Sequence, residues 1–381
     1  MTMSVPRPLT TFRQRVVMRR LNRPDLWLLM SSAGLAGLGV VMVFNASYFY
    51  AQDRFGDPYL YVRKHLVFLA LGVVAMLAVS RVRLQWFERL AYPLLLCFVV
   101  LLSLLLIPGV GVTHGGARRW IGIGPFSFQP SEFLKTVVVL YLARSIARKH
   151  ERITTFSTGV VPHVLIGGLC IVLVGVQPDF GTAVILTLVL VLMLWGGGAR
   201  PAHLVGLALA ALPVIGFSLM HASYRKGRVL AFLDPWRHSQ DIAFQLVQSL
   251  IAFGSGGLTG IGLGESMQKM AFLPEAHTDF IFALIGEELG LCGALVVLVL
   301  FAIVGMRGFR IAMRHPDSFA GMLAFGITLV IMLEAVVNVG VVVGLLPTKG
   351  LALPFISYGG SALIGTFVQV GILAALSRMT G

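Results

Sequence analysis

Long apolar stretches separated by short polar breaks dominate this sequence. Each stretch is close to the roughly 20 residues that an α-helix needs to cross a bilayer. The ten stretches cover approximately residues 25–49, 62–80, 90–107, 130–146, 159–176, 180–198, 203–220, 279–305, 319–344 and 357–377. This pattern predicts an all-α polytopic membrane protein with about ten transmembrane helices.

The charges between the stretches predict how the chain crosses the membrane. An even number of crossings places both termini on one side. If that side is the cytoplasm, the inner segments hold 18 Lys and Arg in 64 residues and the outer segments 12 in 128. Cytoplasmic segments carry the excess of basic residues, so we expect both termini in the cytoplasm. A basic tail (1–24) and a short C-terminus (378–381) then flank a membrane domain (25–377), with a large extracytoplasmic loop, 221–278, between spans seven and eight.

Composition narrows the class of protein further. Of the 381 residues, 57% are apolar and 12% are charged, which excludes a soluble globular protein, where roughly a quarter are charged. The net charge of +14 would suit nucleic acid, but the basic residues form no single patch, so we expect no nucleic-acid partner. The three cysteines lie apart within apolar stretches, a spacing that indicates neither disulfides nor a thiolate metal site.

One segment of the outer loop has a different pattern. Polar residues recur there at helical spacing among apolar ones: Asp241, Gln245, Gln248 and Ser249. Such a helix, over 241–253, would lie along a membrane surface or roof a cavity. A glycine-rich run, 254–264, follows. Its part 260–264 superficially resembles a phosphate-binding loop, but it lacks the preceding strand that such loops require.

Two arginines and a tryptophan precede the fourth span on the outer side. Guanidinium groups bind phosphate oxygens and an indole stacks on a sugar, so Arg118, Arg119 and Trp120 are candidates for binding a phosphorylated ligand. The alternative is contact with lipid headgroups. Glu132 and Lys135 share one face at the start of the span, where they belong either to this site or to a salt bridge at the helix start.

Three carboxylates lie at the outer ends of spans or inside one. Asp279 lies where span eight begins, among apolar neighbours that would raise its pKa by desolvation. Such a carboxylate is a candidate general base, and the alternative is that it caps the N-terminus of the span. Asp179 lies in a tight turn, as a ligand or as the cap of span six. Glu334, inside span nine, either joins helices or marks a transport path, and Lys349 beyond it is a further candidate cation.

Several long motifs follow one another along the chain. They are GGARRW (115–120), QPSEFLK (129–135), QPDFGTA (177–183), FLPEAHTDFIFALIGEELG (272–290) and NVGVVVGLLPTKGLALPFISYGGSAL (338–363). Together they resemble the SEDS family, the shape, elongation, division and sporulation proteins, and they cover nearly all of the membrane portion in order. The forms QPDF and PTKG resemble the division branch more than the elongation branch, whereas a sporulation member is harder to separate.

The resemblance implies a ten-span glycosyltransferase that polymerises lipid II into peptidoglycan on the outer face of the bacterial cytoplasmic membrane, at the division septum. Its partners would be a class B penicillin-binding transpeptidase and other divisome proteins. By the same resemblance, Asp279 is the catalytic carboxylate and Trp120 belongs to the active region. The substrate-binding candidates at motif positions are Arg118, Arg119, Trp120, Glu132, Lys135, Asp179, His277, Lys349 and Ser357.

Three questions stay open at the level of the sequence. A divalent cation, Mg²⁺ or Mn²⁺, is a candidate cofactor, but no ligand set identifies it. A lipid II flippase would use the same cations and carboxylates along a path reaching both faces, although eleven of the sixteen acidic residues lie on the outer side. A non-catalytic division scaffold would need only helices and a partner surface, and it predicts that Asp279 is dispensable.

Overall fold

The computed structural model describes residues 24–379 except 115–116, 125, 221–226, 228–231, 241–242 and 267–276, so the basic tail lies outside it. Ten helices correspond to the expected spans. They are α2 (Leu26–Phe55), α3 (Leu60–Val79), α4 (Leu84–Leu105), α5 (Pro130–Arg148), α6 (Val161–Val176), α7 (Phe180–Gly196), α8 (Pro201–Met220), α13 (Gly290–Arg314), α14 (Ser318–Val342) and α15 (Gly360–Ser377). In the described part, seven helical segments are long and apolar enough to cross a membrane. The chain is therefore a multi-pass membrane protein.

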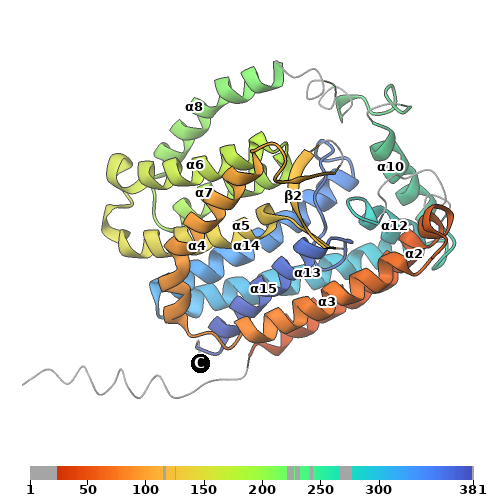
Figure 1. Cartoon of the computed structure of the whole chain (residues 1–381), viewed down its shortest axis with the longest axis horizontal. Helices are drawn as coiled ribbons and strands as arrows, with labels where there is room; N and C mark the ends of the chain where they lie inside the picture. The colour runs from red at the N-terminus through yellow and green to blue at the C-terminus, as the bar shows by residue number, and fades with distance from the viewer. Residues whose placement is uncertain are drawn as a thin grey trace, which may run out of the picture.

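A small antiparallel sheet between α4 and α5 lies outside the all-α prediction (Figure 1). Its three strands pair in the order β1 (Val112–His114), β2 (Ala117–Ile123) and β3 (Phe126–Phe128). The strands were not predicted because two of them have only three residues, too few to show the alternation that marks a strand. The sheet places the expected Arg-Arg-Trp cluster on an ordered strand.

The expected eighth span is broken in the structure. A short helix, α12 (Ile281–Glu288), ends before α13 begins, and Gly290 at the junction has φ +65°. Glycine adopts this left-handed conformation without the steric penalty of a side chain, and it commonly follows the end of a helix. A continuous helix over 279–305 was therefore wrong, and α13 also continues past it to Arg314.

The glycine-rich run packs against this break. The Ile261 N–H donates to the carbonyl of Glu287 (3.0 Å), and the Leu291 N–H donates to the carbonyl of Gly257 (3.0 Å), so the run supplies partners to backbone groups on both sides of the junction. At Gly256 an added Cβ would overlap the backbone of α12. This segment holds α10 close to α12, and at this distance there is no room for a side chain at Gly256.

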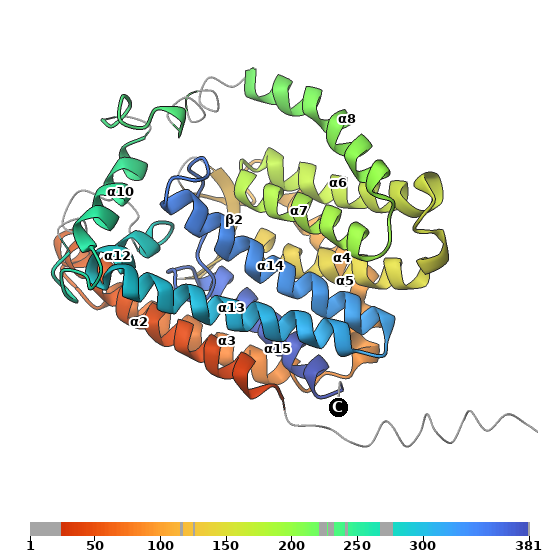
Figure 2. The same ribbon diagram turned by 180° about the vertical axis from the view of Figure 1, so that it is seen from behind.

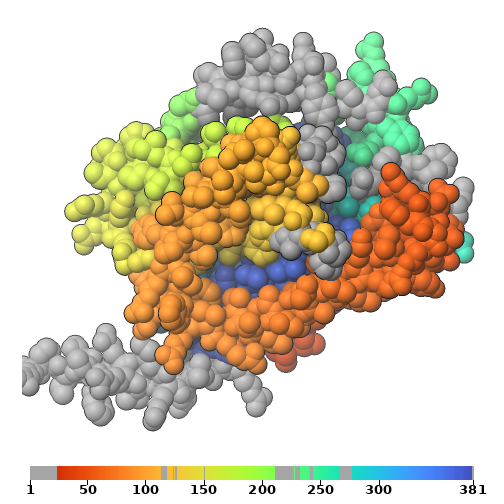
Figure 3. All heavy atoms as spheres, in the orientation of Figure 1, coloured from red at the N-terminus to blue at the C-terminus, as the bar shows by residue number. Residues whose placement is uncertain are grey.

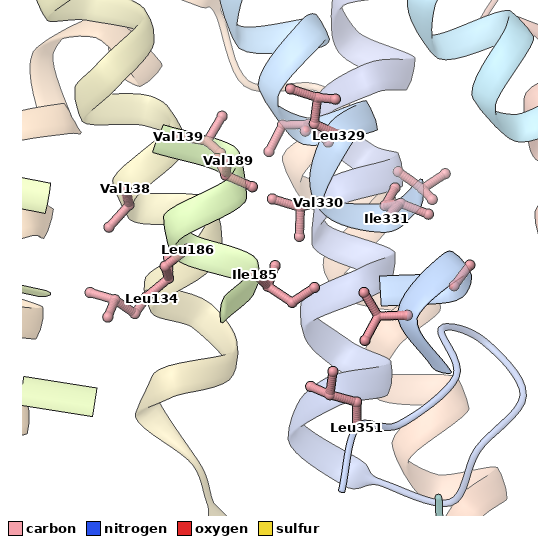
Figure 4. Packing of buried hydrophobic residues seen from close by; sticks show 14 of the residues in the cluster. Leu134, Val138, Val139, Ile185, Leu186, Val189, Leu329, Val330, Ile331 and Leu351 are labelled. Carbon is pink, nitrogen blue, oxygen red and sulfur yellow. The ribbon is translucent and has the colours of Figure 1, made fainter. Parts of the chain in front are cut away.

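Part of the core lies between α5, α7 and α14, whose aliphatic side chains pack together (Figure 4). Gly326 of α14 allows this approach, because a Cβ there would stand 2.6 Å from Val139 of α5 and 2.7 Å from Met193 of α7. Small residues at helix contacts let backbones approach in a membrane, where packing replaces the hydrophobic effect as the driving force. The loop after α14 adds Leu351 to this core.

The two ends of the helical domain meet on one face. The Asp25 N–H donates to Oγ of Ser377 (3.1 Å), and the Asp25 carboxylate accepts from Nε of Arg307 (2.8 Å). The start of α2 thus lies beside the end of α15, as Figures 1 and 2 also show. Both ends of the helical domain thus lie on the same side, as the sequence predicted.

The expected amphipathic helix is present as α10 (Phe244–Gly256). Gln245 reaches the cavity described below, as a roofing helix would. Ser249, expected on the polar face, is instead buried, and its Oγ donates to the carbonyl of Val342 (2.5 Å). The prediction failed at this position because a serine that satisfies its hydroxyl on a backbone carbonyl can be buried. Asp241 lies outside the described residues.

Candidate active site

A cavity of 770 Å³ lies at the end of the molecule where α5, α7, α12 and α15 begin. It is also bordered by β2, by α10 and by the loop between α14 and α15. Its lining residues include Arg119, Trp120, Gln129, Glu132, Asp179, Thr182, Gln245, Asp279, Lys349, Gly350, Tyr358 and Ser361. Segments far apart in the sequence thus converge on one space.

Four helix N-termini border this cavity. Each carries the equivalent of roughly half a positive charge from aligned peptide dipoles and exposes N–H groups without an intrahelical partner. Side-chain capping is seen only at α7, where Asp179 accepts from Thr182 N (3.3 Å); the first residues of α5, α12 and α15 receive no such cap. The backbone therefore adds positive potential that suits a phosphorylated ligand.

Asp279 lies in a turn that leads into α12, not on the helix. The N-cap of α12 is Phe280, so the alternative that Asp279 caps this helix was wrong. The side chain is half-buried and lines the cavity. Its Oδ2 lies 2.7 Å from the position that a Cβ would take on Gly350, so the absence of a side chain at Gly350 makes room for the carboxylate.

Asn338 of α14 joins the turn of Asp279 to the loop that carries Lys349. Its Nδ2 donates to the carbonyl oxygens of Asp279 (2.9 Å) and Leu351 (2.6 Å). Both hydrogens of one amide group are used, and Asn338 itself is buried. Asn338 follows Glu334 by one helical turn. Its role could not be predicted from the sequence, because its two partners are 59 and 13 residues away.

Arg119 and Trp120 both reach the cavity although neighbours on a strand point to opposite faces. The reason is a β-bulge: Val112 pairs with Trp120 whereas Thr113 pairs with Arg118, so Arg119 is an extra residue on β2. Bulges redirect side chains in this way. Arg118 is not among the lining residues, and its Cγ lies 2.9 Å from the Cβ position of Gly111.

Asp179 is both a cap and a part of the cavity wall. Besides capping α7, it accepts from Ser131 Oγ (2.9 Å) and Gln129 Nε2 (3.2 Å), and it lies 3.7 Å from the Arg119 guanidinium. It is almost fully buried. The network fixes the start of α5 against α7 and orients Arg119 at the rim.

A buried ion cluster lies beside the cavity. Lys135 Nζ donates to Glu132 (2.7 Å) and to Glu334, and only Glu132 lines the cavity. The helix-start salt bridge expected for Glu132 and Lys135 is thus present, and Glu334 extends it across two helices. Glu334 has a structural partner, as the helix-joining alternative requires.

His277 and Ser357 lie beside the cavity and are not among its lining residues. The His277 ring packs against Tyr61 (4.8 Å between centroids) and Tyr358 (5.7 Å), and its carbonyl accepts from the Tyr358 N–H (2.9 Å). Ser357 Oγ accepts from Leu353 N (2.8 Å) and shapes the loop. Burial, with Tyr61 as a lesser cause, raises the pKa of Tyr358 to about 12.

The cavity gathers most of the residues expected from the sequence. Those that line it are Arg119, Trp120, Glu132, Asp179, Asp279 and Lys349, whereas Arg118, Lys135, His277 and Ser357 lie around it. Asn338, Gly350, Tyr358 and Ser361 stand within the motif 338–363, but the sequence predicted no role for them. No group of three or more His, Cys, Asp or Glu side chains that could hold a metal ion occurs among the described residues.

Comparison with known proteins identifies the family. The model of the Cell cycle protein family, named for FtsW, RodA and SpoVE, matches residues 26–381. The chain belongs to this family, the SEDS proteins. The resemblance inferred from the motifs is thereby confirmed.

Named relatives of this SEDS protein come from several bacteria. It is 43% identical over 365 residues to the probable peptidoglycan glycosyltransferase FtsW of Geobacter metallireducens, covering 96% of this chain and 97% of the relative. It is 42% identical over 357 residues to stage V sporulation protein E of Bacillus subtilis, covering 93% and 97%.

Solved structures share the fold of this SEDS protein. A chain from a peptidoglycan synthase complex that coordinates polymerization and crosslinking aligns with a TM-score of 0.78 at 29% identity, covering 94% of this chain and 98% of that one. Thermus thermophilus RodA aligns with a TM-score of 0.70 at 26% identity, covering 93% and 97%. The helical membrane architecture is therefore that of the family.

Proposed function

We propose that this SEDS protein is a peptidoglycan glycosyltransferase that polymerises lipid II on the outer face of the cytoplasmic membrane. One observation carries the proposal: a single cavity brings the Asp279 carboxylate together with Arg119, Lys349 and four helix N-termini. Such a site pairs a base with groups that stabilise an anionic leaving group. The names of the FtsW relatives support the same activity.

In the proposed reaction, Asp279 takes the proton of the 4-hydroxyl of the acceptor N-acetylglucosamine. The oxygen attacks the anomeric carbon of the donor sugar, the bond from that carbon to the pyrophosphate oxygen breaks, and the configuration inverts. The undecaprenyl pyrophosphate leaves as an anion, so no general acid is needed, unlike in ordinary glycoside hydrolysis. Arg119, Lys349 and the helix N-termini would stabilise its charge.

We propose that the protein acts at the division septum together with a class B penicillin-binding transpeptidase. The division-type motifs QPDF and PTKG, the FtsW relatives and the fold match to a chain of a peptidoglycan synthase complex support it. Holding a polymerising and a crosslinking protein together raises the effective concentration of the new strand near the crosslinking enzyme.

The experiment that tests this function is polymerisation of fluorescent lipid II by the purified protein with its transpeptidase, with and without EDTA. Glycan ladders are expected, and loss of the ladders with EDTA would add a metal requirement. Translocation of lipid II across vesicles without any ladder would contradict the proposal in favour of a flippase. The charge of Glu334 was the reason to consider a transport path. Because Glu334 is paired with Lys135, its position inside the span has a structural explanation.

A further inference from the structure

A continuous set of aromatic rings leads from the cavity to the surface. Tyr358 lines the cavity and its ring contacts Tyr61 (5.1 Å between centroids). Tyr61 in turn contacts Tyr50 (5.9 Å) and Phe55 (6.2 Å), and His277 packs against Tyr61 and Tyr358. Tyr50 and Phe55 are 37% and 53% exposed. We call these two residues, together with Tyr59, the aromatic ledge.

The ledge belongs to the tip of the α2–α3 hairpin. Tyr59 is 52% exposed and stacks on Phe44 (5.7 Å). In the space-filling view the end of this hairpin stands on one side and the sheet segment on the other, with atoms of the C-terminal segment visible between them (Figure 3). The rings of Tyr50 and Phe55 are connected to the cavity wall through Tyr61 and Tyr358.

Membrane anchoring is the other role that exposed tyrosines take, because aromatic belts lie at headgroup level, next to apolar spans. This tip carries a dense group of charges: Asp53, Arg54, Asp57, Arg63 and Lys64. Because charged side chains are costly at membrane depth, these residues place the tip outside the hydrocarbon layer.

The growing product needs a surface of this kind. A cavity of 770 Å³ is in the range of about 300–1,000 Å³ that encloses a drug-sized ligand, so a strand of many sugars cannot stay within it. A sugar ring presents an apolar C–H face and a rim of polar groups. Aromatic side chains offer an apolar face with a polar end, and here Arg54 donates to the Tyr50 hydroxyl (2.8 Å), which adds polar groups at the edge.

We propose that the aromatic ledge holds the elongating glycan strand as it leaves the cavity. The inference rests on the proposed function, because the occupant is the polymer made there. Contact between the strand and the rings would delay release of the product, so that more sugars are added before it dissociates. The ledge would then set strand length.

The test compares strand lengths made by the full-length protein from lipid II. The double variant Tyr50→Leu/Phe55→Leu keeps apolar side chains but removes both rings, and Tyr50→Phe/Phe55→Tyr keeps the rings. We expect the leucine variant to shorten the mean strand roughly twofold to tenfold, as expected from an aromatic contact of about 0.5–1.5 kcal/mol, and the ring-retaining variant to make long strands. Trp236→Leu, an exposed aromatic of the outer loop, is the matched control.

The possible outcomes separate the explanations. Strands of wild-type length from the leucine variant would overturn the proposal. Equal shortening by Trp236→Leu would also overturn it, since a general effect of surface aromatics would then suffice. A single Tyr59→Leu variant repeats the comparison if the double variant does not fold. Absence of polymer from the wild-type protein would instead contradict the proposed function.

Discussion

At the scale of single residues, the position of the Asp279 carboxylate depends on a glycine. Gly350→Ala would place a methyl group 2.7 Å from Oδ2, which is too close for both to stay. We expect kcat for polymerisation to fall roughly a hundredfold, as displacements of about 1 Å do in active sites, with little change in thermal stability. The control is Gly168→Ala on α6, where a Cβ meets no atom within 4 Å. Full activity of Gly350→Ala would contradict the placement of Asp279.

Asn338 holds that carboxylate indirectly, through two backbone carbonyls. Asn338→Asp keeps the size of the side chain but replaces the donor by a group that repels both oxygens. We expect kcat to fall about tenfold or more while KM changes little, because the turn, not the substrate contacts, is disturbed. Gln369→Glu alters another buried amide, which donates to Thr136 of α5 and does not line the cavity, and serves as the control. A change confined to stability in both variants would argue against a positioning role.

The buried cluster of Lys135 contributes to folding. Lys135→Met leaves two carboxylates, Glu132 and Glu334, without their shared partner. Removing one partner of a buried pair costs about 3–5 kcal/mol. We expect a clear fall in the detergent-solubilised melting temperature, and a smaller one for Glu334→Gln, since Lys135 then keeps Glu132. Equal melting temperatures for the wild type and Lys135→Met would show that the cluster is not formed.

At the scale of elements, the glycine-rich run fixes α10 against the helix break. In Gly256→Ala the new Cβ would overlap the backbone of α12, and overpacking of this kind costs roughly 1–3 kcal/mol. We expect lower thermal stability together with lower activity, because α12 follows the turn of Asp279. Gly254→Ala in the same helix meets no atom within 4 Å and should behave as wild type. Indistinguishable melting of the two variants would contradict the close packing.

The elements that the sequence could predict are those with a local signal. Helices α3, α7 and α14 lie within a few residues of their expected ranges, because apolar length alone defines a membrane span. The sheet and the break at Gly290 could not be predicted in this way. Three-residue strands carry no usable alternation, and a break supported by residues 256–261 depends on contacts distant in sequence.

At the scale of the whole molecule, the family motifs predicted several segments that border the cavity, but not which of their side chains reach it. Arg119 and Lys135 both belong to motifs, yet one reaches the cavity through a bulge and the other is neutralised by Glu334, 199 residues away. Sequence spacing cannot show which cation faces a ligand when its partner comes from another helix. The convergence of four helix starts likewise exists only in the folded protein.

We propose that Asp279 acts as the base in the polymerisation of lipid II. The most direct measurement is the initial rate of lipid II polymerisation by Asp279→Asn, purified with the transpeptidase, beside wild type and Asp234→Asn, which removes an acid from the outer loop. We expect a folded Asp279→Asn protein without glycan ladders and a fully active Asp234→Asn protein. Wild-type ladders from Asp279→Asn would contradict it.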